Sequence, residues 1–157
     1  MELATNDFLQ KCLSRAVVEV IGTIAGLDFS RNPETTQKQH VNSGGLTGAM
    51  LVHGERNAML SITMSKEDAA AIVSAMTGVN QLGLSDADLY DGVAEMANMV
   101  AGRAKALLSG TGYHYTITAP FTIVGENHFI VYKKQASQVS MSFTAGEMII
   151  QLGLAYV

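Results

Sequence analysis

The stretch GLTGAMLVHGERNAMLSITM, Gly45 to Met64, decides the fold of this chain. Apolar side chains alternate with small or polar ones along it, which is the period of a β-strand that buries one face. The segment HGERN, His53 to Asn57, interrupts the alternation with residues that favour a turn. The sequence therefore predicts a β-hairpin, around which the rest of the sheet can be built.

The residues before the hairpin predict one long helix. Apolar residues recur at helical spacing from Asp7 to Ile24. Asn6 or Thr5 can cap the start of this helix, and Gly26 can end it. The polar stretch from Ser30 to Gln39 has no apolar period and contains a proline, so we expect a loop or an edge strand there.

Two further helices are predicted after the hairpin. Ser65 can cap the first of them, with Asp68 three residues later, and Gly78 can end it. Ser85 can cap the second, which is expected to run from about Asp86 to Leu108 before the glycine-rich segment that follows.

The remainder of the chain is predicted to form strands. The segments that alternate or run apolar are Tyr115 to Gly125, His128 to Lys134, Gln138 to Ala145 and Glu147 to Val157. The order of elements predicts an α+β fold, with helices packed on one face of a largely antiparallel sheet. No linker divides the sequence, so we expect a single domain over residues 1–157.

Composition and charge exclude several classes of protein. With 48% hydrophobic and 15% charged residues, the chain is typical of a globular domain rather than a disordered one. Its net charge of -4 provides no basic surface for nucleic acid. The longest apolar run, Ala16 to Leu27, is too short to cross a bilayer, and the N-terminus has no apolar signal core. We therefore expect a soluble cytoplasmic protein, in which the single cysteine, Cys12, is a small buried residue.

The last predicted helix carries an unusual polar face. At about 100° per residue, Asn98 lies about 60° from Glu95 around the helix axis, Asp91 about 40° and Gly102 about 20°. The opposite side of the helix carries the apolar residues Val93, Met96, Ala97, Val100, Ala104 and Leu107. One face is thus suited to the sheet, and the other presents a carboxylate, a carboxamide and a gap.

The gap and the carboxamide both weaken the helix. A glycine inside a helix costs about 1 kcal/mol relative to alanine, and an asparagine costs more than about half of that. Core packing does not offset either cost, because neither Asn98 nor Gly102 faces the predicted core. The simple interpretation is a solvated helix face; the functional one is a surface shaped for a partner that lies flat against the helix.

The run DGVAEMANMVAGRAKALL, Asp91 to Leu108, resembles the CheC, CheX and FliY family of chemotaxis phosphatases, and in particular its CheX-type members. The family pattern D-x-x-x-E-x-x-N-x-x-x-G matches Asp91, Glu95, Asn98 and Gly102. A strand with a proline and a closing glycine follows in the family, and Pro120 and Gly125 match it here. The resemblance covers the chain from about Leu9 to the C-terminus.

This resemblance implies hydrolysis of the aspartyl phosphate on a CheY-like response regulator. It implies that Asn98 positions the attacking water and that Glu95 docks to the active-site lysine of the regulator. Gly102 would then allow close approach of the regulator backbone. The chain would need no cofactor of its own, because the Mg²⁺ belongs to the regulator.

The first predicted helix matches the family pattern only in part. Members of the CheC type carry two such sites, but here Glu19 is followed by Gly22 where the asparagine should be. The resemblance thus implies a single site per chain. It also implies a homodimer, as in CheX-type members, which would give two sites per assembly.

Each of three charged residues near the site allows two interpretations. Asp91 can contact the regulator or support the first helical turn through the helix dipole. Arg103 and Lys105 can contact an acidic regulator surface or favour the C-terminal end of the helix. We treat all three as candidate partner-binding residues.

The sequence is also compatible with functions other than a phosphatase. The four histidines form no metal-ligand spacing with each other or with Cys12, so no metal site is expected. A non-catalytic module that binds a response regulator, of the kind found in the flagellar switch, would share the fold. A dimerisation domain with a relic motif is a third alternative. The intact Glu95 and Asn98 favour the enzyme.

Overall fold

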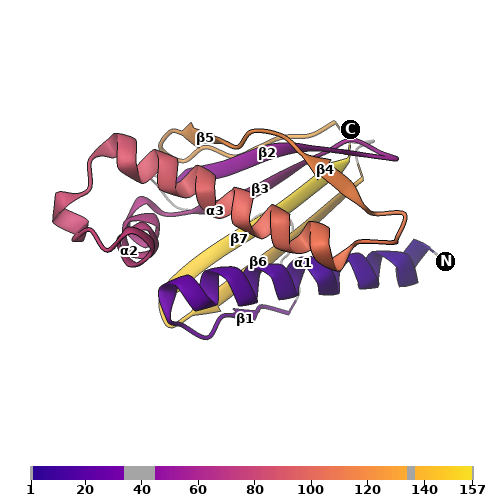
Figure 1. The fold of residues 1–157 in the computed structure, drawn as a ribbon, viewed down its shortest axis with the longest axis horizontal. Coiled ribbons are helices and arrows are strands. Elements are labelled where there is room, and N and C mark those ends of the chain that lie inside the picture. Colours follow the sequence, from indigo (N-terminus) through magenta and orange to yellow (C-terminus); the bar gives the residue numbers. More distant parts are fainter. Residues whose placement is uncertain (1, 34–44, 134–136, 157) are drawn as a thin grey trace.

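The computed structural model describes residues 2–33, 45–133 and 137–156. Within these ranges, one antiparallel sheet is covered by helices on one face, as predicted (Figure 1). The helices are α1 (Glu2–Ala25), α2 (Lys66–Thr77) and α3 (Asp86–Leu107), with a 3-10 helix, η1 (Gln81–Gly83). The strands are β1 (Ser30–Arg31), β2 (Leu46–Gly54), β3 (Ala58–Met64), β4 (Tyr115–Ile117), β5 (Phe121–Val124), β6 (Gln138–Ala145) and β7 (Met148–Tyr156).

The predicted hairpin is confirmed and lies inside the sheet. Leu46 of β2 pairs with Met64 of β3, and the register continues to Val52 and Ala58. The strand order is β1-β6-β7-β3-β2-β4, and β5 pairs with β2 as well. The described strand pairs are all antiparallel.

The core lies between the helices and one face of the sheet. Alternate residues of the strands supply it, as the period of two predicted, and the largest of these fully buried side chains are Leu46, Met50, Leu60, Ile62, Met64, Met141 and Phe143. From the helices, Leu13, Ile21 and Met96 pack against them. The long helices α1 and α3 cross this face side by side (Figure 1). Their packing leaves one side of α3 free of the core.

A glycine sets the distance between α3 and the sheet. A Cβ atom at Gly48 of β2 would overlap the backbone carbonyl of Val93 and lie 3.2 Å from the Cβ of Ala97. Only a residue without a side chain therefore lets β2 approach α3 this closely. The same contact therefore sets the distance between the sheet and the polar face of α3.

The predicted helix starts and stops are largely confirmed. The Ser65 hydroxyl accepts a hydrogen bond from the Asp68 amide at 3.0 Å, and Ser85 accepts one from the Asp88 amide at 3.1 Å. Gly78 closes α2 in the left-handed conformation, with φ of 76°. The prediction of a cap at Asn6 or Thr5 is wrong, because α1 begins at Glu2 and runs through both positions.

Two predictions about strands need correction. The segment Tyr115 to Gly125 forms two short strands, β4 and β5, with Pro120 between them. Residues 128–133 are not a strand, although they alternate. Asn127, with φ of 54°, lies in the turn after β5, and the His128 ring then bonds to the Thr47 hydroxyl at 2.5 Å.

The prediction of a loop or an edge strand after α1 is confirmed for the residues that the structure describes. Ser30 and Arg31 form the edge strand β1, which pairs with β6. The rest of that prediction, from residue 34 to residue 39, lies outside the described residues. Lys134, the last residue of the predicted strand His128 to Lys134, and Val157, the last residue of the predicted strand Glu147 to Val157, also lie outside the described residues.

Candidate functional site

The exposed face of α3 is the candidate site. The opposite face is buried, with Leu89, Gly92, Val93, Met96, Ala97, Val100, Ala101 and Ala104 against the core. Leu107, placed on that face by the sequence, is partly buried and packs against the same core. On the outer side, Asp91 and Glu95 are exposed and Asn98 is half-buried. The two faces predicted from the helical period are therefore present.

The side chains of Glu95 and Asn98 make no polar contact within the part of the chain that the structure describes. Over the described ranges, the Glu95 carboxylate and the Asn98 carboxamide have no hydrogen bond or ion pair. A carboxamide can donate and accept hydrogen bonds, and a carboxylate accepts only. Both groups are thus available to a molecule that docks on the helix.

Gly102 leaves the predicted open space beside them. A Cβ atom built at this position would meet no heavy atom within 4 Å. Internal packing does not require a glycine here, in contrast to Gly48. A glycine inside a helix costs about 1 kcal/mol of stability relative to alanine. This cost is consistent with a partner molecule that must approach α3 closely at Gly102.

Met99 belongs to the same face and was missed from the sequence. It follows Glu95 by four residues and adjoins Asn98, and 36% of its surface is exposed. The four-residue spacing could have identified it, since positions i and i+4 share one helix face. A flexible thioether beside polar groups offers an adaptable apolar contact.

Asp91 and Glu95 also line a groove beside α3. The groove has a volume of about 440 Å³, and the other residues that line it are Thr77, Val79, Leu84, Asp88 and Gly92. The acidic residues of the first turn of α3 are Asp86 and Asp88. Asp91 lies beyond that turn, where the helix dipole acts weakly, so the first-turn interpretation of Asp91 is wrong.

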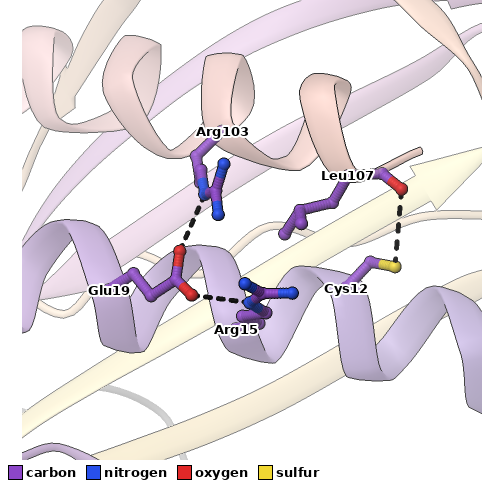
Figure 2. A network of polar contacts seen from close by, with 5 residues as sticks. All are labelled: Cys12, Arg15, Glu19, Arg103 and Leu107. Carbon is purple, nitrogen blue, oxygen red and sulfur yellow. Dashed lines mark hydrogen bonds and ion pairs between the residues drawn. The ribbon is translucent and has the colours of Figure 1, made fainter. Parts of the chain in front are cut away.

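Arg103 is held by α1, as Figure 2 shows. Its Nε atom lies 2.7 Å from Oε2 of Glu19, and Nε of Arg15 lies 2.6 Å from Oε1 of the same carboxylate. These hydrogen bonds, from Arg15 first and Arg103 second, hold the pKa of Glu19 below its usual range. Arg103 therefore joins the two long helices, whereas Lys105 lies in the last turn of α3 without an ion pair in the described part of the chain.

Glu19 and Gly22 of α1 lie where the resemblance would place a second site. Glu19 is committed to Arg15 and Arg103. A Cβ atom at Gly22 would lie 2.9 Å from the backbone carbonyl oxygen of Leu27, so a side chain there would require the chain to shift. Packing therefore disfavours an asparagine at this position, and the single site per chain stays a prediction.

Cys12 lies in the contact between α1 and α3, as predicted for a buried residue. Its thiol points to the Leu107 carbonyl oxygen, 4.0 Å away (Figure 2). Burial raises the pKa of this thiol, which disfavours the reactive thiolate. Cys12 is thus a packing residue of the helix pair.

The described residues contain neither a metal-binding cluster nor a helix suited to span a membrane. No group of three or more histidine, cysteine, aspartate or glutamate side chains there is arranged to hold a metal ion. None of the described helices combines the length and the hydropathy that crossing a membrane requires.

Known proteins resemble this chain in sequence and in structure. Residues 46–144 match the family model described as "Chemotaxis phosphatase CheX". The CheY-P phosphatase CheX of Thermotoga maritima is 26% identical over 112 residues, which cover 71% of this chain and 72% of that protein. The chemotaxis protein CheX of Desulfovibrio desulfuricans, solved by crystallography, has a TM-score of 0.80 and 26% identity, covering 95% of this chain and 99% of that one.

A second solved structure contains a partner. The complex of CheX with CheY, BeF3 and Mg²⁺ from Borrelia burgdorferi matches with a TM-score of 0.70 and 18% identity, and the match covers 96% of each chain. At this identity the likeness concerns the fold. Because the family model spans more than half of the sequence and includes α3 with Glu95 and Asn98, the chain belongs to the CheX family of chemotaxis phosphatases, which are hydrolases.

Proposed function

We propose that this protein hydrolyses the aspartyl phosphate of a CheY-like response regulator in the cytoplasm, and that Asn98 and Glu95 carry the activity. Membership of the CheX family supports the reaction, and the relative from Thermotoga maritima is named for the same substrate. The observation that carries the assignment of residues is that Glu95 and Asn98 lie on one open helix face, beside the space left by Gly102, with no side-chain partner among the described residues.

Asn98 is proposed to position the attacking water. Phosphoryl transfer depends mainly on placing the nucleophile in line and on stabilising the charge of the transferred group. A carboxamide can accept a hydrogen bond from water through its oxygen and can donate one through its nitrogen. It therefore orients a water molecule without acting as a strong base, as a glutamine does in small GTPases.

Glu95 is proposed to fix the docking. Its exposed carboxylate stands about one turn before Asn98, and it pairs with the active-site lysine of the regulator. The Mg²⁺ remains in the regulator, consistent with the Mg²⁺ of the Borrelia burgdorferi complex. No cofactor of this chain enters the reaction, and a homodimer of the chain would present two such sites.

The direct test is the lifetime of the regulator phosphate. A CheY-like regulator from the same organism is phosphorylated with a small phosphodonor and Mg²⁺, and its decay is followed with and without the protein. The proposal expects faster decay with the protein, in proportion to its concentration. Unchanged decay of every regulator of the organism would contradict the proposal.

Substitution of Glu95 separates docking from chemistry. Glu95→Ala is expected to weaken regulator binding about 10-fold or more, since it leaves the partner lysine without its countercharge. The fold should be retained, because Glu95 is exposed and has no partner among the described residues. The initial rate against regulator concentration should show a raised KM and a smaller loss of kcat; an unchanged KM would contradict the docking role.

Gly102→Ala should change stability and activity in opposite directions. The new methyl group meets nothing within 4 Å in the chain, so the helix should gain about 1 kcal/mol. The same methyl group would hinder the regulator, and KM should rise, more so for Gly102→Leu. Urea unfolding and the phosphate-decay assay check the two effects; a stabilised variant with wild-type KM would show that nothing approaches this surface.

A further inference from the structure

The connection between α2 and α3 presents an apolar tip beside the candidate site. Leu82 of η1 is 99% exposed, and Val79, three residues earlier, is 41% exposed. Isolated exposed apolar residues are common on protein surfaces and need no function. The connection differs from such cases because hydrogen bonds hold its backbone and because it shares a groove with Glu95.

The backbone of this connection is held by a set of hydrogen bonds. The Asn80 side chain accepts from the Leu82 amide at 3.0 Å, and the Asn80 carbonyl accepts from the Gly83 amide at 2.8 Å. The Ser74 hydroxyl donates to the Val79 carbonyl at 2.5 Å. These bonds restrain the backbone that presents Leu82 to solvent, which lowers the entropy lost when a partner covers it.

The groove joins this connection to the candidate site. Val79 and Leu84 line one side of it, and Asp91 and Glu95 line the α3 side. Asn98 lies twelve residues after Asp86, the first residue of α3, which is about 18 Å along the helix. A typical protein interface covers about 800 Å² on each partner, roughly 30 Å across, so a single partner can cover both regions.

The charges of this surface define the chemistry of the partner. Asp88, Asp91 and Glu95 are exposed and have no ion pair among the described residues, and Asp86 is paired with Lys66 at 3.5 Å. An acidic groove with an apolar rim fits a protein surface that has basic side chains around an apolar recess. The active-site lysine of a response regulator provides such a basic group.

We infer that Val79 and Leu82 form the second half of the regulator-docking surface and set its specificity. This inference rests on the proposed function. Leu82 enters an apolar recess beside the phosphorylation site of the regulator while Glu95 meets the lysine and Asn98 meets the water. The tip takes part in binding only, because it stands apart from the reacting groups.

The test compares Leu82→Ser with Leu51→Ser. Leu51 is 45% exposed and lies on β2, where Met50 and Val52 on either side of it face the core, so it points to the other face of the sheet. Initial rates against phosphorylated regulator should give a KM about 10-fold higher for Leu82→Ser at unchanged kcat, as expected for the loss of one buried leucine contact. Leu51→Ser should match the wild type, and Leu82→Met, which stays apolar, should restore most of the affinity.

The outcomes separate the two proposals. A wild-type protein that does not speed phosphate loss from any regulator overturns the proposed function, and this inference with it. An active wild type with unchanged KM in Leu82→Ser overturns the docking tip alone, as does a loss confined to kcat. Analytical sedimentation of Leu82→Ser and Leu51→Ser measures their oligomeric state. If Leu82→Ser changes the oligomeric state, the tip contacts a second copy of the chain and the inference is wrong.

Discussion

Asn98→Ala is expected to slow dephosphorylation of the regulator by at least about 100-fold, because misplacing a reacting group by about 1 Å already has an effect of that size. The carboxamide makes no hydrogen bond in the described part of the chain, so its removal leaves no internal group unpaired. Alanine also favours the helix more than asparagine does, so the stability should be equal or slightly higher. The effect therefore falls on kcat, measured as phosphate decay at saturating protein.

The matched control for Asn98→Ala is Thr23→Ala. Thr23 is an exposed polar residue of α1, and the described structure gives it no side-chain hydrogen bond. Thr23→Ala should leave the decay rate unchanged. Regulator binding should remain close to wild type in Asn98→Ala, since Glu95 and the apolar tip are intact. Wild-type kcat in Asn98→Ala would show that another group positions the water.

Gly48→Ala is expected to destabilise the fold by about 3 kcal/mol, the upper part of the usual range for overpacking a core. The added Cβ atom would overlap the Val93 carbonyl and come within 3.2 Å of the Ala97 Cβ, and a backbone group cannot rotate away as a side chain can. The helix α3 must then move away from β2. Urea unfolding with unchanged m-value measures the loss.

Gly102→Ala serves as the control for Gly48→Ala. Both substitutions add one methyl group at a glycine. Gly48 lies on β2 where it packs against α3, and Gly102 lies on α3 itself. One methyl group points into backbone and the other into open space. Opposite signs in the free energy of unfolding are expected. A Gly48→Ala variant as stable as the wild type would show that β2 and α3 separate without loss, and that Gly48 does not set the height of the site.

The sequence alone determined the elements that depend on neighbouring residues. The hairpin of β2 and β3 follows from a period of two, and the caps at Ser65 and Ser85 follow from side chains that reach amides three residues away. The two faces of α3 follow from the helical period, because core packing selects the apolar side and leaves the other free. For that reason the open face around Glu95 and Asn98 could be predicted without a structure.

Tertiary structure decided what depends on distant residues. The ion pair of Arg103 joins positions 84 residues apart, so the sequence left Arg103 equally open to a partner. Residues 128–133 alternate like a strand, but the His128 ring bonds to Thr47, and residues 128–132 line a pocket with residues of β3, β6 and β7 instead of pairing with a strand. The groove between Val79 and Glu95 exists only because α2 and α3 pack together. Local patterns fix which side chains share a face, whereas the energy of contacts between remote segments fixes which of those side chains remain free for a partner.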